Sequence, residues 1–290
     1  ITKNSVIFKI ECKKFYVDDS KKSIFDASKL LFDKINQGNF IYNTDGLIFT
    51  PTLLGVGCSN KEDKSVQRKV TWDRSFKWKP ASHNTIDFLV KTVKTDNSKD
   101  FVGNKLNVGN KTTRLNSIDQ YKKIKLHVGF NEGKHGVMDP VTAMFENKVT
   151  RRDDMRYKAA LFYPTNPYDD KAHMCHQLLK KDKFGENQMM TIENEVFTDD
   201  MIVEFAYDDT KEPYERWKPL RVRYDKTMEY KRKKNNFGNA FHVANTNWKS
   251  IHYPITESIL CSNDKKQLSD IDDIYYNKER NKKSLTVKLR

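Results

Sequence analysis

The chain has 290 residues, long enough for two domains that each bury a core. Its 53 lysines and arginines outnumber its 39 aspartates and glutamates, and the net charge of +14 favours a nucleotide or RNA partner over an acidic protein or a neutral ligand. No apolar run approaches the ~20 residues of a membrane span, so we expect no membrane partner. The four cysteines are widely spaced and form no C-x-x-C pair, which suits a reducing cytosol.

The predicted elements fall into three parts. In residues 1–83 we expect strands at 6–10, 46–51 and 76–79, and a helix at 23–37 because apolar residues recur there at helical spacing. In residues 84–250, strand-like runs at 86–91, 124–130, 157–163, 201–207 and 220–224 are separated by polar loops, and 95–117 is predicted to be a loop or an extra hairpin. Five such strands fit an OB barrel. Residues 251–290 include a charged stretch, 264–283, that predicts a linker helix or tether.

Two lysines flank a tryptophan in the run Phe76-Lys77-Trp78-Lys79-Pro80. On a strand, residues two apart project from the same face, so Lys77 and Lys79 lie side by side and Trp78 points to the other face, where it can pack. Like charges in this position are unfavourable unless an anion lies between them, and a nucleotide phosphate fits that role. A solvated basic strand is the alternative interpretation.

Two arginines alternate in the same way in Arg221-Val222-Arg223-Tyr224-Asp225-Lys226. We expect this stretch to be a strand with both guanidinium groups on one face. Asp225 can hold one of the cations, and Lys226 adds a further positive charge. Upstream, Asp45 precedes Gly46 and an apolar run, which supplies a carboxylate. Together these motifs indicate a site for a polyphosphate and its metal.

In this order, the motifs resemble the later motifs of mRNA guanylyltransferases, a branch of the lysine nucleotidyltransferases that includes ATP-dependent DNA ligases. The wider set NTIDFLVK at 84–91, IVEF at 202–205 and NWKSIHYPIT at 247–256 resembles the capping enzymes of large DNA viruses of the poxvirus, asfarvirus and giant-virus type. The resemblance implies an α+β chain. Residues 1–83 would be the C-terminal portion of a nucleotidyltransferase domain with a ligase-like antiparallel sheet, 84–250 an OB-fold domain with insertions, and 251–290 a linker toward a methyltransferase domain.

The resemblance also implies a reaction in which GMP passes from GTP to a lysine and then to the 5′ diphosphate end of RNA. The nucleophilic lysine of the K-x-D-G motif is absent, so we expect an interior piece of a longer enzyme that is inactive alone. Neighbouring triphosphatase and methyltransferase domains of the same polypeptide are the expected partners. The implied location is the host cytoplasm, in a viral factory, or the virion.

The resemblance assigns a role to each charged residue of the motifs. Lys77 and Lys79 would contact the α-phosphate, and Asp45 would act near a Mg or Mn ion. Arg223 and Lys226 would meet the β- and γ-phosphates. Three further residues are expected to orient the phosphate-binding side chains without contacting the phosphates, namely Arg221, Asp225 and Asp87. Asp87 could also add to the metal site.

Two other functions remain open. An ATP-dependent polynucleotide ligase fragment shares the Asp-Gly and Lys-x-Lys elements, and a non-catalytic OB module would bind RNA with a decayed phosphate site. Asn239 and Trp248 are interpreted as architectural, and the run His173-Met174-Cys175-His176 as structural or surface residues, because no second pair stands at zinc-finger spacing.

Overall fold

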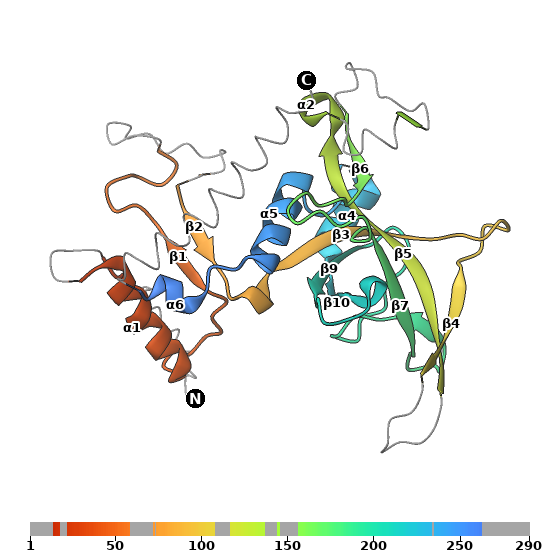
Figure 1. Ribbon diagram of the computed structural model, residues 1–290, viewed down its shortest axis with the longest axis horizontal. Coiled ribbons are helices and arrows are strands. Elements are labelled where there is room, and N and C mark those ends of the chain that lie inside the picture. The colour runs from red at the N-terminus through yellow and green to blue at the C-terminus, as the bar shows by residue number, and fades with distance from the viewer. Residues whose placement is uncertain are drawn as a thin grey trace, which may run out of the picture. The chain divides into compact units, whose positions relative to one another are not determined.

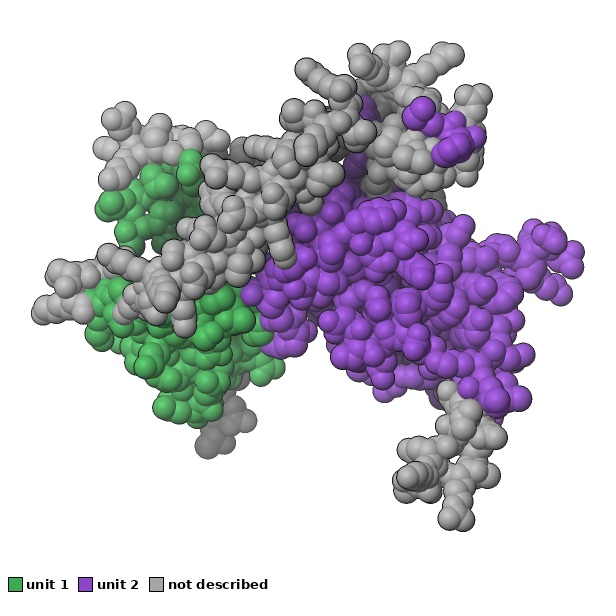
Figure 2. Space-filling model, viewed as in Figure 1, with its two compact units in different colours: residues 1–80, 255–290 green, residues 81–254 purple. Residues whose placement is uncertain are grey.

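The computed structural model describes residues 14–17, 22–58, 72, 74–107, 117–136, 144–145, 156–233 and 235–262. The chain divides into two compact units, which we call unit 1 (residues 1–80 and 255–290) and unit 2 (residues 81–254), shown in Figure 2. The strand predicted at 6–10 and the linker predicted at 264–283 lie outside the described residues. The three domain assignments stay predictions.

The described residues of unit 1 form two helices and a two-stranded antiparallel sheet (Figure 1). The elements are α1 (Ile24–Asn36), β1 (Leu47–Phe49), β2 (Phe76–Trp78) and α6 (Glu257–Leu260). Helix α1 begins with a capping box, in which the Ser23 hydroxyl accepts from the Asp26 amide and the Asp26 carboxylate accepts from the Ser23 amide. The helix predicted at 23–37 is therefore confirmed.

Unit 2 is built on an eight-stranded, antiparallel sheet with the order β10-β9-β3-β5-β7-β8, in which β4 and β6 also pair with β5. The strands are β3 (Thr85–Thr92), β4 (Val102–Asn107), β5 (Ser117–Asn131), β6 (Tyr157–Leu161), β7 (Met174–Lys181), β8 (Asn187–Met189), β9 (Ile202–Tyr207) and β10 (Trp217–Val222). The sheet curls, since the amide of Ile192, just after β8, donates to the carbonyl of Pro219 in β10 at 2.9 Å. The predicted α+β class is thus confirmed, whereas the nucleotidyltransferase and OB arrangement stays a prediction.

Strand β3 is buried on both faces, which makes it the centre of unit 2. Ile86, Phe88 and Val90 belong to the main core with Trp248, whereas Leu89 packs in a second cluster with Ile202, Tyr230 and Phe237. Helical elements in the described part of this unit include η1 (Ala81–His83), α2 (Glu132–His135), η2 (Pro213–Glu215), α4 (Tyr224–Lys233) and α5 (Phe241–His252). Tyr230 comes from α4 and Trp248 from α5, so α4 contributes to the second cluster and α5 to the main core. Trp248 is therefore architectural, as expected.

The five strands predicted in residues 84–250 are all present, the choice between a loop and an extra hairpin at 95–117 is decided, and two features differ from the prediction. The extra hairpin is real, because β4 pairs with the first part of β5. Strands β7 and β8 were not predicted: only Cys175 and Gln177 are buried in β7, and its last two residues are exposed lysines. The last strand ends at Val222 instead of continuing through Tyr224, which already belongs to α4.

Acidification is expected to destabilise unit 2 through His127, which lies in β5 opposite Leu89 and Leu161 of its neighbouring strands. Burial lowers the pKa of His127 from 6.5 to about 4. Between these values the unfolded chain binds a proton that the folded chain excludes, so the free energy of unfolding falls as the pH drops from 6.5 to about 4. Urea unfolding across this window measures the loss.

The control is His127→Gln, which should lose less stability over the same window. His173 and His176 also have lowered pKa values because of burial, but they are present in both proteins and cancel in the difference. Equal losses in the two proteins would contradict the assignment to His127.

Candidate functional site

Asp45 and Lys79 form an ion pair beside the small sheet of unit 1. Lys79 Nζ lies 3.0 Å from Asp45 Oδ2, and the side chains are 42% and 81% exposed. Gly46 allows this approach: its φ is +146°, and a Cβ there would lie 1.9 Å from the Trp78 carbonyl oxygen. The Asp-Gly pair therefore needs its glycine, because the two backbones touch directly next to the ion pair.

Lys77 and Trp78 point to opposite sides of strand β2, as predicted. Lys77 is exposed and pairs across the sheet with the exposed Ile48. The Trp78 ring packs edge-on against Phe32 of α1, with ring centroids 5.1 Å apart, and its indole N–H donates to the Ile255 carbonyl at 2.7 Å. The tryptophan thus anchors the strand while the lysines on either side stay accessible to solvent.

Asp45 is the principal predicted metal ligand, and Asp87 is the further candidate. Mg²⁺ keeps several waters and is usually bound by one or two carboxylates together with substrate phosphates. An exposed carboxylate beside a lysine fits a metal that arrives with a nucleotide, and not a preformed metal centre. Within the described ranges, no group of three or more His, Cys, Asp or Glu side chains could hold a metal ion.

In unit 2, Asp87 joins two of the predicted phosphate-binding cations. Its Oδ2 accepts from Arg223 Nη1 and from Lys226 Nζ, each at 2.6 Å, and its side chain is only 7% exposed. The side chains of Arg223 and Lys226 are 25% and 24% exposed, so part of each faces solvent. Although burial disfavours the charged guanidinium, the negative charge of Asp87 raises the pKa of Arg223 overall.

Arg221 lies next to this group and meets a carboxylate that was not predicted. Glu204 is the cross-strand partner of Asp87, and it accepts from Arg221 Nε and from the Thr85 hydroxyl, both at 2.6 Å. Two carboxylates opposite each other destabilise a sheet unless cations offset them. Burial raises the pKa of Glu204, but the hydrogen bonds from Thr85 and Arg221 lower it overall. The available signal was an acidic residue inside the apolar run 202–205.

The backbone at 221–226 corrects the prediction of a single strand. Strand β10 ends at Val222, and Asp225 and Lys226 lie in the first turn of α4. The helix starts here because the Thr227 amide donates to the Arg223 carbonyl at 2.8 Å, while the Thr227 hydroxyl accepts from Ile202 at 2.9 Å. The two arginines still reach one face, since their partners Asp87 and Glu204 are opposite each other. Asp225 holds Arg223 Nη2 at 3.4 Å, as expected.

A short segment after α4 clamps the backbone of Asp87. The Asn239 side-chain oxygen accepts from the Asp87 amide at 2.7 Å, and the Asn239 amide donates to the Asp87 carbonyl at 2.8 Å. Gly238 has φ +86°, and a Cβ there would lie 2.3 Å from the Asp87 carbonyl oxygen. Asn239 is thus architectural, as expected, and its role is to fix the carboxylate that holds the two cations.

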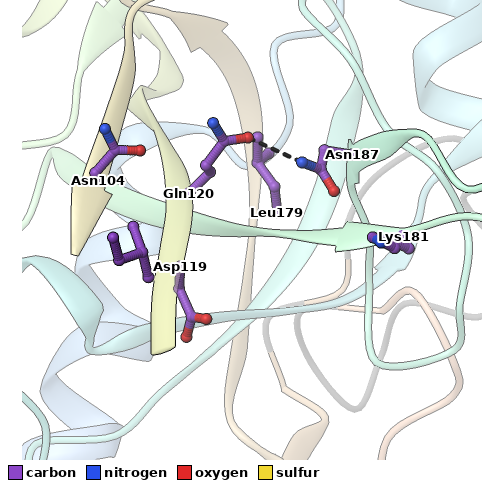
Figure 3. A pocket seen from close by; sticks show the side chains of 7 residues that line it. Asn104, Asp119, Gln120, Leu179, Lys181 and Asn187 are labelled. Atoms are coloured by element: carbon purple, nitrogen blue, oxygen red, sulfur yellow. Dashed lines mark hydrogen bonds between the residues drawn. The ribbon is translucent and has the colours of Figure 1, made fainter. Parts of the chain in front are cut away.

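Two further features of unit 2 are separate from these charges. A pocket at β4, β5, β7 and β8 is lined by the amides of Asn104, Gln120 and Asn187, with the Gln120–Asn187 hydrogen bond drawn in Figure 3. In the run 173–176, Cys175 lies in the core, where burial raises its pKa to about 12, whereas the His176 ring stacks between Tyr121 and Tyr214. The structural interpretation of this run therefore holds.

Comparison with known proteins gives one informative relative. No family model matches the chain. Over 250 residues it is 28% identical to the probable mRNA-capping enzyme of Acanthamoeba polyphaga mimivirus. The chain is thus similar to a probable mRNA-capping enzyme. The match covers 82% of this chain but 18% of that protein, so the chain spans less than a fifth of the relative's length. None of the helices in the described part of the chain has the length and apolar character needed to cross a membrane.

Proposed function

We propose that the chain is part of an mRNA guanylyltransferase, which transfers GMP from GTP through a lysine–GMP intermediate to a 5′ diphosphate RNA end. The observation that carries the proposal is the convergence of Arg223 and Lys226 on one buried carboxylate, each at 2.6 Å. Two cations held at this spacing, with part of each in solvent, suit the adjacent oxygens of a polyphosphate. The relationship to a capping enzyme supports GTP as the source of that polyphosphate.

In this proposal, the residues of unit 1 bind the α-phosphate of GTP and stabilise its charge during the reaction. The nucleophilic lysine, outside this chain, forms a nitrogen–phosphorus bond as the bond to the β-phosphate oxygen breaks, and pyrophosphate leaves. Lys77 and Lys79 stabilise the negative charge that develops on the α-phosphate oxygens. A Mg²⁺ or Mn²⁺ ion bound at Asp45 would neutralise phosphate charge. The diphosphate end of RNA then displaces the lysine and takes the GMP.

Unit 2, interpreted as an OB domain, supplies the contacts to the leaving group. Arg223 offers a planar guanidinium and Lys226 a compact ammonium, which together suit the β- and γ-phosphates. Arg221 is held by Glu204 and keeps the neighbouring carboxylate satisfied, so it supports the site instead of touching the ligand.

Labelling with radioactive nucleotides tests the proposal in the full-length protein that contains this chain. Incubation with GTP and Mg²⁺ should give a covalent GMP adduct, and ATP should give none. Arg223→Ala and Lys226→Ala should each lower the labelling, whereas replacement of the exposed Lys180 of β7 should leave it unchanged.

Each alternative has its own outcome in this assay. An adduct formed from ATP instead of GTP would indicate a polynucleotide ligase. No adduct with either nucleotide, together with RNA binding, would indicate a non-catalytic binding module.

A further inference from the structure

The charged cluster of unit 2 balances its own charges. Three cations face three carboxylates, namely Arg221, Arg223 and Lys226 against Asp87, Glu204 and Asp225. A polyphosphate therefore does not meet free cations, and it must compete with carboxylates already in place. Because Arg221 is paired with Glu204, the cations for which a polyphosphate and a carboxylate would compete are Arg223 and Lys226.

The two carboxylates that hold Arg223 differ in exposure, in distance from the guanidinium and in how firmly their backbone is held, and these properties decide which of them a ligand can displace. Asp87 is 7% exposed, accepts at 2.6 Å, and has its backbone clamped by Asn239. Asp225 is 66% exposed and lies 3.4 Å from the other guanidinium nitrogen, Nη2. Breaking the buried pair would leave an uncompensated charge, whereas breaking the exposed pair returns a carboxylate to water.

We propose that Asp87 is a fixed anchor and Asp225 an exchangeable counter-ion: a polyphosphate replaces Asp225 at Arg223 while Asp87 keeps Arg223 and Lys226 in position. The inference rests on the proposed phosphate-binding role of these two cations. Asp87 is thus a positioning residue and does not touch the ligand.

The donor geometry allows both contacts at once. Arg223 uses Nη1 for Asp87, so Nη2 becomes available when Asp225 leaves. Lys226 has three N–H donors, and Asp87 accepts one of them. A phosphate group offers several charged oxygens in place of one exposed carboxylate, so it can outcompete Asp225.

Binding of inorganic tripolyphosphate, measured by calorimetry with this chain and two isosteric variants, tests the proposal. Asp225→Asn and Asp87→Asn each remove one negative charge, so Coulomb attraction alone would tighten binding in both. We expect Asp225→Asn to bind tripolyphosphate about threefold more tightly at low salt, because the exposed carboxylate that competes for Arg223 is gone. We expect Asp87→Asn to bind at least about tenfold more weakly, because the two cations lose their orientation.

Thr227→Val separates positioning from simple loss of stability. It removes the buried hydroxyl that accepts from Ile202 and so weakens the attachment of α4, but it leaves every charge of the cluster in place. The variant should unfold at a lower temperature and keep its tripolyphosphate affinity. If Asp87→Asn does not fold, the sign of the Asp225→Asn effect decides.

Three results would overturn the inference: tighter binding by Asp87→Asn, unchanged or weaker binding by Asp225→Asn, or no binding by the unaltered chain. Arg223→Ala and Lys226→Ala show which proposal has failed. If neither weakens binding, the phosphate-binding role itself is wrong. If both weaken it and the two aspartate variants do not differ in sign, the anchor-and-exchange arrangement alone is wrong.

Discussion

Replacing Lys79 with alanine in the full-length protein is expected to lower formation of the enzyme–GMP adduct by roughly 10²–10³-fold, the usual effect of removing one preorganised donor to developing charge. The protein should stay folded. The Lys79–Asp45 pair is exposed on both sides, at 42% and 81%, and such pairs contribute only ~0–1 kcal/mol. Labelling with radioactive GTP measures the first effect, and thermal unfolding measures the second.

Two variants control this result. Lys79→Arg should not rescue labelling, because a planar fork replaces a compact charge. Lys180→Ala removes an exposed lysine of β7, outside both charged groups, and should label like the unaltered protein. Near-normal labelling of Lys79→Ala would remove Lys79 from the proposed site.

Gly238→Ala is expected to destabilise unit 2 by more than ~2 kcal/mol, because it combines a left-handed backbone with a backbone clash. The new Cβ would lie 2.3 Å from the Asp87 carbonyl oxygen and 2.9 Å from its carbon. Neither atom can move without breaking the clamp that Asn239 makes on Asp87. Urea unfolding gives the loss in free energy, and tripolyphosphate affinity should fall along with it.

Gly185→Ala is the matched control. Gly185 has φ +84°, close to the +86° of Gly238, but a Cβ there would meet nothing within 4 Å. This variant should lose only the ~1–2 kcal/mol of the left-handed conformation and should bind tripolyphosphate normally. Equal losses in the two variants would mean that the approach of Gly238 to Asp87 contributes nothing.

Strand-like apolar runs predicted strands of unit 2 where the residues of the run are buried in the core. Ile86, Phe88 and Val90 face the main core from β3, and Val203 and Phe205 do so from β9. Strand β7 escaped prediction because its pairing with β5 is made largely by half-buried and exposed residues. The backbone pairing that forms it depends on β5, which comes from a distant part of the chain.

In the Lys-Trp-Lys and Arg-x-Arg motifs, the alternation of side chains along a strand predicted which residues share a face, but it did not predict where the strand ends. Trp78 packs and Lys77 faces solvent, as a strand requires. For Arg221 and Arg223 the shared face is also right, but the chain turns into a helix directly afterwards. That turn is set by Thr227 and its contact with Ile202 on β9, which no pattern within 221–226 encodes.

By itself, the sequence determined the five predicted strands of unit 2, helix α1 of unit 1, and the charged side chains that stand out from apolar runs. These depend on neighbours a few residues apart. Only the tertiary structure decided which carboxylate each cation meets. Asp87 is 136 residues from Arg223 and 139 from Lys226. Those contacts exist because β3 pairs with β9 in one register and α4 starts where β10 ends, and local spacing carries no record of either.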